Sequence, residues 1–146
     1  MRNSDYTFFK GLHLELSNIR DDDERVLLSY KGENSPSPGF EKSIHRKDTY
    51  ELIVNVKDID NAYQVRTYGK YRGYTFGVFK LGKEGMVFIG TTDKAAYKKL
   101  NLTEVNQNWY GDDIQGTELD KIWEERTPTR GLPMPEGLER IKVVKS

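Results

Sequence analysis

The sequence predicts an α+β domain in which a mainly antiparallel sheet, built from hairpins, carries two short helices. Short runs of alternating apolar and polar residues are separated by turns that contain Gly or Asp, which is typical of hairpin strands. Two other segments begin with a helix cap, and one of them also has apolar residues at helical spacing. Aromatic residues make up 12% of the 146 residues and supply large side chains for a core.

Two stretches share one pattern: an aromatic residue, a basic residue, Gly, two variable residues and a large apolar residue. Each leads into an alternating strand, a polar turn and a second apolar run, and so predicts a hairpin. The repetition indicates either an internal duplication of a hairpin unit or two hairpins made alike by the physics of one sheet. The units are 9–14 with Leu12, Leu14 and Leu16 alternating before 26–30, and 71–76 with Tyr74, Phe76 and Val78 alternating before 86–89. Each hairpin unit is followed by a segment that resembles the other more weakly, 57–63 after the first and 103–110 after the second.

The remaining elements follow in order. Residues 32–39 are rich in Pro, Ser and Gly and predict an exposed loop, and 49–56 predict a strand. Residues 93–100 predict a short helix capped by Asp93. Residues 117–126 predict a second helix, with a capping-box-like pair at its start and Pro128 at its end. A last strand is expected within 138–144, and we expect a single domain over 1–146.

Charge and composition narrow the class of function. The 23 basic residues balance the 23 acidic ones, which removes the simplest electrostatic argument for binding nucleic acid or a membrane. No apolar run approaches the roughly 20 residues that span a bilayer, and no signal-peptide pattern is present. The chain also lacks cysteine, which fits a reducing compartment. We therefore expect a cytoplasmic protein that does not enter a membrane.

We expect no enzyme, because no catalytic motif is complete. His13 and Glu15 lie on one face of a predicted strand and could supply two metal ligands, with His45 as a third. Exposed strand residues without a site role are the simpler interpretation. Residues 82–85 lack the spacing of a phosphate-binding loop. The expectation is therefore no catalytic residue, no metal and no cofactor.

One predicted strand interleaves basic and aromatic side chains. Aromatic rings can stack on splayed bases while cations contact phosphates, so this stretch could bind single-stranded nucleic acid. The alternative is a strand whose tyrosines pack across a sheet while its cations stay in water. The residues are Arg66, Tyr68, Lys70, Tyr71 and Arg72, followed by Tyr74.

A second feature is acidic. An acidic surface beside aromatic residues suits a protein partner with a basic patch, because opposed potentials speed encounter and aromatic rings anchor the contact. A nuclease, whose site is basic, is one such partner. The alternative is ordinary solvated surface. The candidate partner-binding residues are Asp21, Asp22, Asp23, Trp109, Tyr110, Asp112, Asp113 and Glu118.

Three segments give the chain a resemblance to a known class: 71–76 with its Tyr-Arg-Gly start, 105–110, and the Ile-Trp-Glu-Glu-Arg run within 122–128. With its balanced charge and many tyrosines, the chain resembles bacterial immunity proteins, the antitoxins of polymorphic and contact-dependent toxin systems. The resemblance implies a cytoplasmic, non-enzymatic protein that binds a cognate toxin stoichiometrically and occludes its active site. The alternatives are a single-stranded nucleic-acid-binding module and a phage-derived or accessory structural subunit.

Overall fold

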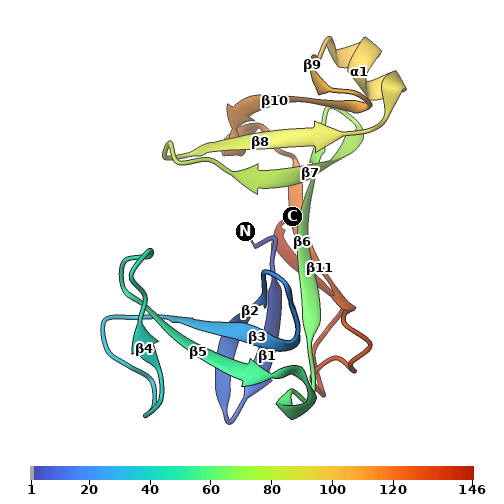
Figure 1. Ribbon diagram of the computed structural model, residues 1–146. Coiled ribbons are helices and arrows are strands. Elements are labelled where there is room, and N and C mark those ends of the chain that lie inside the picture. The colour runs from blue at the N-terminus through green and yellow to red at the C-terminus, as the bar shows by residue number, and fades with distance from the viewer. Residues whose placement is uncertain (1) are drawn as a thin grey trace. The chain divides into compact units, whose positions relative to one another are not determined.

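The structure is a computed structural model that describes residues 2–146, and it is predominantly β (Figure 1). Strands account for 54% of the chain and helices for 9%. The described residues contain a single α-helix, α1 (Lys94–Leu100). The prediction of an α+β fold with two helices was therefore wrong, while the prediction of a mainly antiparallel sheet built from hairpins is confirmed.

The chain divides into two compact units. Unit 1 comprises residues 2–3, Val65–Arg126 and Glu139–Ser146, and unit 2 comprises Ser4–Gln64 and Thr127–Leu138. The single domain expected over residues 1–146 stays a prediction. No helix among residues 2–146 is long and apolar enough to cross a membrane.

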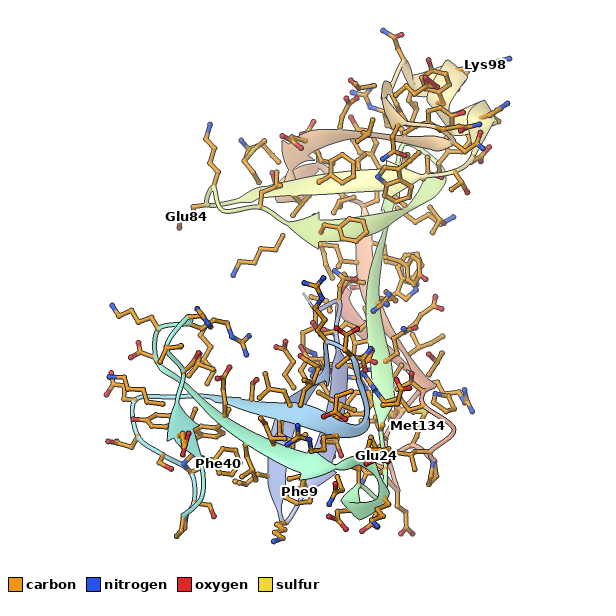
Figure 2. All side chains as sticks on the ribbon, viewed as in Figure 1. Phe9, Glu24, Phe40, Glu84, Lys98 and Met134 are labelled. Carbon is orange, nitrogen blue, oxygen red and sulfur yellow. The ribbon has the colours of Figure 1, made fainter. Side chains whose placement is uncertain are left out.

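Unit 2 is an antiparallel sheet in the order β4-β5-β3-β2-β1-β6. Alternation along its strands turns small and medium-sized apolar side chains inward, and Phe9 and Phe40, both labelled in Figure 2, pack against this core. The core residues are Leu14, Leu16, Val26, Leu28, Ile59 and Ala62. The elements are β1 (Asp5–Phe9), β2 (Leu12–Ile19), β3 (Asp22–Lys31), β4 (Glu41–Lys42), β5 (Thr49–Asn55), the 3₁₀ helix η1 (Val56–Asp58) and the start of β6 (Tyr63–Tyr71).

Unit 1 continues β6 into a sheet with the order β9-β10-β8-β7-β6-β11-β12. Its core is built on Phe76, Val78 and Ile89, each at most 1% exposed, and α1 packs against it through Ala96. The elements are β7 (Tyr74–Lys80), β8 (Met86–Thr91), α1, β9 (Thr103–Asn106), β10 (Trp109–Gln115), η2 (Gly116–Glu118), β11 (Lys121–Pro128) and β12 (Ile141–Lys145).

The two units repeat one strand order. Each strand of the series β4-β5-β3-β2-β1-β6 has a counterpart five strands later in β9-β10-β8-β7-β6-β11. A 3₁₀ helix precedes the last strand in both, and the residue after it, Ile59 or Leu119, is buried and donates its N–H to the carbonyl three residues earlier. This correspondence favours an internal duplication over chance similarity of two hairpins.

The shared sequence pattern marks equivalent turns. Lys10 and Gly11 join β1 to β2, and Arg72 and Gly73 join β6 to β7, in each case with positive φ at both residues. Positive φ at both central residues is the type I′ turn that matches the twist of a hairpin. The predicted similarity between 57–63 and 103–110 was wrong. Because η2 is the counterpart of η1, residues 57–63 correspond to residues 117–123.

The helix predicted over 117–126 is wrong. Strand β11 occupies most of this stretch, because Ile122, Glu124 and Arg126 are buried at alternate positions while Trp123 and Glu125 face outward. The helix was predicted from a capping-box-like pair and an apolar stripe, and the burial of the charged residues Glu124 and Arg126 does not fit that pattern. The helix over 93–100 is confirmed as α1, where the Asp93 carboxylate accepts the Ala95 N–H at 2.8 Å. Strand β5 confirms the strand over 49–56, and β12 confirms the last strand.

Candidate functional site

The open face of the unit 1 sheet carries the candidate site. In β6, alternation buries Val65, Thr67, Gly69 and Tyr71 and turns Arg66, Tyr68 and Lys70 to the other side. Tyr68 lies opposite Gly77 of β7, Gly77 opposite Gly90 of β8, and Gly90 opposite Gly111 of β10. A row of three glycines therefore crosses the face beside a tyrosine.

Aromatic rings lie on this glycine row. A Cβ added to Gly90 would sit 2.2 Å from Trp109 Cζ2, and one added to Gly111 would sit 2.5 Å from Phe88 Cζ. Only a residue without a Cβ lets these rings lie so close to the backbone. Both rings therefore lie close to the backbone of this face.

Five rings on this side of the sheet, called here the aromatic face, form two groups: Phe79, Phe88 and Trp109 in one, and Tyr68 and Trp123 in the other. Phe79, Phe88 and Trp109 have ring centroids 6.1–6.2 Å apart, and Tyr68 stacks on Trp123 of β11 at 6.0 Å. All five are half-buried, so part of each ring remains open to a partner. In β12, Val143 lies opposite Trp123 and is 51% exposed, which extends the apolar surface by one strand.

Charges border this surface. On β11, the Lys121 ammonium lies 5.6 Å from the centre of the Trp123 ring, and Glu125 accepts the Trp123 Nε1–H at 2.9 Å. On β10, Asp113 is exposed directly opposite Phe88. A hollow of about 310 Å³ opens between Arg66, Tyr68, Phe79 and Trp109, with Asn3 and the two glycines 77 and 90 completing most of its lining.

Only part of the predicted acidic surface lies here. Trp109 and Asp113 belong to the open face, whereas Tyr110 is 3% exposed and stacks on Tyr97 at 4.1 Å inside unit 1. Asp112 accepts a hydrogen bond from the Thr103 hydroxyl at 2.8 Å, and Glu118 accepts the Gln115 N–H at 2.9 Å as part of the η2 cap. These two carboxylates therefore have structural roles within unit 1.

The predicted residues Asp21, Asp22 and Asp23 belong to unit 2, at the turn between β2 and β3. The Asp22 carboxylate accepts hydrogen bonds from the Glu24 and Arg25 N–H groups and from Arg25 Nε, the last at 2.7 Å. The hydrogen bond from the Arg25 side chain lowers the pKa of Asp22. Asp22 therefore stabilises its own turn.

The basic–aromatic stretch divides between two environments. Arg66, Tyr68 and Lys70 share the open face. Tyr71 is 9% exposed and meets Phe76 edge to face in the core, while the Arg72 guanidinium lies over the Tyr71 ring in the turn. Three of the five predicted residues are thus displayed together.

Sequence reasoning missed Phe79, Phe88, Trp123 and the glycine row. A signal was present, because an aromatic residue and a glycine stand two apart in three strands: Gly77 and Phe79, Phe88 and Gly90, Trp109 and Gly111. Residues two apart in a strand point to the same side of a sheet. The spacing therefore predicts rings lying beside glycines on one face.

The model of one protein family matches residues 1–130. The chain belongs to this family, uncharacterised conserved protein UCP033725. All five rings of the aromatic face lie within the matched residues, and β12 follows them. No curated protein and no solved structure gave a match.

The pair His13 and Glu15 belongs to unit 2 and lies on one side of β2. His13 Nε2 is 2.6 Å from the Tyr63 hydroxyl, and its ring stacks on Tyr6 at 5.1 Å. Within residues 2–146, no group of three or more His, Asp and Glu side chains is placed to hold a metal ion.

Proposed function

We propose that this protein is an immunity-type binding protein, which neutralises a cognate protein toxin by binding it one to one and occluding its active site. In this proposal it acts in the cytoplasm, without a cofactor and without catalysing a reaction. The aromatic face of unit 1 is the contact surface.

The gathering of half-buried rings on one open sheet face carries the proposal. Aromatic residues dominate the energetic centres of protein interfaces, because each buries a large area while fixing few torsions. Here the glycine row lets Phe88 and Trp109 lie close against the sheet, beside the other rings of the face.

The charges indicate which partner fits. Asp113 stands beside Phe88 at the β10 edge, so a basic group of the partner can pair with it while an apolar group covers the rings. A toxin domain that acts on nucleic acid has a basic active site, because it must hold phosphates. Such a site could pair with Asp113 at one side of the aromatic face. The cations Arg66, Lys70 and Lys121 lie elsewhere on the same face.

Single-stranded nucleic acid is the second candidate. It is favoured by Arg66, Tyr68 and Lys70 on the same face, with Lys121 beside Trp123. Rings could stack on bases while these cations contact phosphates. This candidate predicts binding that weakens steeply as salt is raised.

Capture from lysate of the source organism separates the two candidates. Tagged full-length protein is used with and without nuclease treatment, and the retained protein is then expressed alone and together with this chain. The proposal predicts one protein retained in near-equal amount after nuclease treatment, which arrests growth alone and does not arrest it when co-expressed. Recovery of RNA or DNA, with proteins lost on nuclease treatment, would contradict it.

The variant Asp113→Lys tests the assigned surface. It places a cation where the proposal has the basic patch of the partner, so the complex should weaken by more than about 1 kcal/mol. The matched control is Asp21→Lys, at a position 94% exposed in unit 2. Equal affinities of the two variants, measured by calorimetry with the captured partner, would remove Asp113 from the interface.

A further inference from the structure

Unit 2 has a pocket of about 500 Å³ on the open face of its sheet, with Arg46 among the residues that line it. We propose that this pocket binds an oxyanion, the phosphate or carboxylate group of a ligand. The inference is independent of the proposed function, because it concerns unit 2 alone. The lining consists of Tyr6, His13, Glu15, Ser29, Tyr30, Lys31, Arg46, Lys47 and Thr49.

The duplication places this pocket at the position of the hollow in unit 1. In unit 2, Tyr6 lies opposite Glu15, Glu15 opposite Ser29, and Ser29 opposite Glu51. These residues correspond strand by strand to Tyr68, Gly77, Gly90 and Gly111. Where the Trp109 ring covers Gly90 in unit 1, the Arg46 guanidinium hydrogen-bonds to the equivalent Ser29 in unit 2. Equivalent positions of the two units thus carry an aromatic ring in unit 1 and a cationic side chain in unit 2.

The loop that carries Arg46 is fixed by its own hydrogen bonds. The Ser43 hydroxyl accepts the N–H groups of His45 and Arg46 at 3.2 and 3.1 Å, and the Ser43 N–H donates to the Thr49 carbonyl at 2.8 Å. The Thr49 hydroxyl donates to the Lys47 carbonyl at 2.9 Å, and Thr49 is 5% exposed. The loop therefore presents Arg46 and Lys47 in a defined position, which lowers the entropic cost of binding.

Arg46 keeps donors for a ligand. Its Nη2–H group donates to Ser29 Oγ at 2.7 Å. Its distances to the Glu15 and Glu51 carboxylates are 3.8 and 4.0 Å, longer than hydrogen bonds, and 45% of its side chain is exposed. A guanidinium has five N–H donors in a planar fork that matches an oxyanion. With one hydrogen bond, two longer ion pairs and 45% of the side chain exposed, Arg46 retains donors for a ligand.

The charge of the lining favours an anion. Lys31, Arg46 and Lys47 supply three cations against the single carboxylate of Glu15, and Glu51 adds a second carboxylate at the border. His13, whose Nε2 lies 2.6 Å from the Tyr63 hydroxyl, adds a polar ring to the lining. A phosphate or carboxylate between Arg46 and Lys47 would satisfy donors that the two carboxylates leave open.

The test is a titration of the full-length protein, followed by amide chemical shifts. Sodium phosphate and sodium acetate are compared with sodium chloride at equal ionic strength and pH 7. The proposal predicts saturable shifts at Ser29, Arg46 and Thr49, with stronger binding of phosphate indicating a phosphoryl ligand and stronger binding of acetate a carboxylate. No saturation with either anion would overturn it.

Two variants separate a built site from general charge. Arg46→Gln should weaken the binding by about tenfold, because it removes the charged hydrogen bonds. Lys47→Gln should weaken the binding less than Arg46→Gln does. It is the variant to measure if Arg46→Gln does not fold. The matched control is Arg20→Gln, at a position 97% exposed in the same unit. Equal weakening by Arg46→Gln and Arg20→Gln, in proteins with native spectra, would overturn the proposal.

Discussion

At the scale of single residues, the buried charges of β11 are the most consequential feature of unit 1. Glu124 is 5% exposed and Arg126 is 7% exposed. Arg2 donates to the Glu124 carboxylate from Nε at 3.2 Å and from Nη2 at 3.1 Å, and Arg126 donates from Nη2 at 3.3 Å. Glu124 thus pairs with two arginines and ties the N-terminal residues to β11.

Burial raises the pKa of Glu124, but the hydrogen bonds and charges of Arg2 and Arg126 lower it by more, so the pKa lies below its ordinary value of 4.5. A depressed carboxyl pKa stabilises the folded state above the unfolded-state pKa, and this contribution is lost as pH falls through the folded-state pKa. We therefore expect Glu124 to contribute to a loss of stability on the acid side of about pH 4.5.

The variant Glu124→Gln tests this role. It leaves two arginines without a counter-charge, so we expect a loss of about 3 kcal/mol in the free energy of unfolding at pH 7. The difference from wild type should shrink as pH falls below the ordinary pKa. Urea unfolding at several pH values measures both effects, with exposed Glu104→Gln as the control. A constant difference down to pH 3 would contradict the linkage.

At the scale of elements, the glycine row decides how the strands of unit 1 hold the aromatic face. A Cβ at Gly90 would meet the far end of the Trp109 ring, which can swing aside. A Cβ at Gly111 would lie 2.1 Å from the Ile89 carbonyl oxygen, and backbone atoms of a paired strand cannot move as freely. The two glycines therefore have different tolerances.

We expect Gly90→Ala to cost about 1 kcal/mol of stability while displacing the Trp109 ring, and Gly111→Ala to cost about 3 kcal/mol. Urea unfolding gives the stabilities. Tryptophan fluorescence, in a Trp123→Phe background so that Trp109 alone reports, gives the ring environment. Equal stability losses with unchanged Trp109 emission would show that the ring does not lie on the row.

Elements whose charged residues face water could be predicted from the pattern of apolar and polar residues in the sequence. The hairpins built on Leu14 and Phe76 followed from alternation, and α1 followed from its Asp93 cap. Strand β11 did not, because the buried partners of Glu124 come from Arg2, far away in sequence, and from within the strand itself. When two buried positions of a strand hold charged residues, the local sequence no longer shows the apolar alternation that distinguishes a strand from a helix.

At the scale of the whole chain, the duplication is clearer in topology than in sequence. The matching sequence is confined to the type I′ turns and the residues around η1 and η2. The connections differ, since β3 and β5 are joined through a loop with β4, and β8 and β10 through α1 and β9. Because these connections differ in length, equivalent segments are not equally spaced in the sequence, and residues 57–63 were matched with 103–110 instead of 117–123.

The candidate site could be predicted only in part, for reasons of geometry. Trp109 and Asp113 were assigned to one hypothesis and Arg66 and Tyr68 to another, and strand pairing brings all four to one sheet face. Within β10, Tyr110 and Ile114 are buried at alternate positions, so Tyr110 points into unit 1 while Trp109 and Asp113 lie on the open face. Which strands share a face depends on pairing between segments far apart in the sequence, so it cannot be predicted from the local sequence.

The account rests on the claim that the aromatic face of unit 1 binds a protein partner. The most direct test is the affinity of the captured partner, by calorimetry, for Trp109→Ala and Trp123→Ala, with Ile44→Ala as control because Ile44 is 89% exposed in unit 2. Loss of a buried interface tryptophan typically weakens binding by about tenfold or more. We predict such losses for both tryptophan variants and a change of less than about twofold for the control. Wild-type affinity in both tryptophan variants, with folding intact, would contradict the claim.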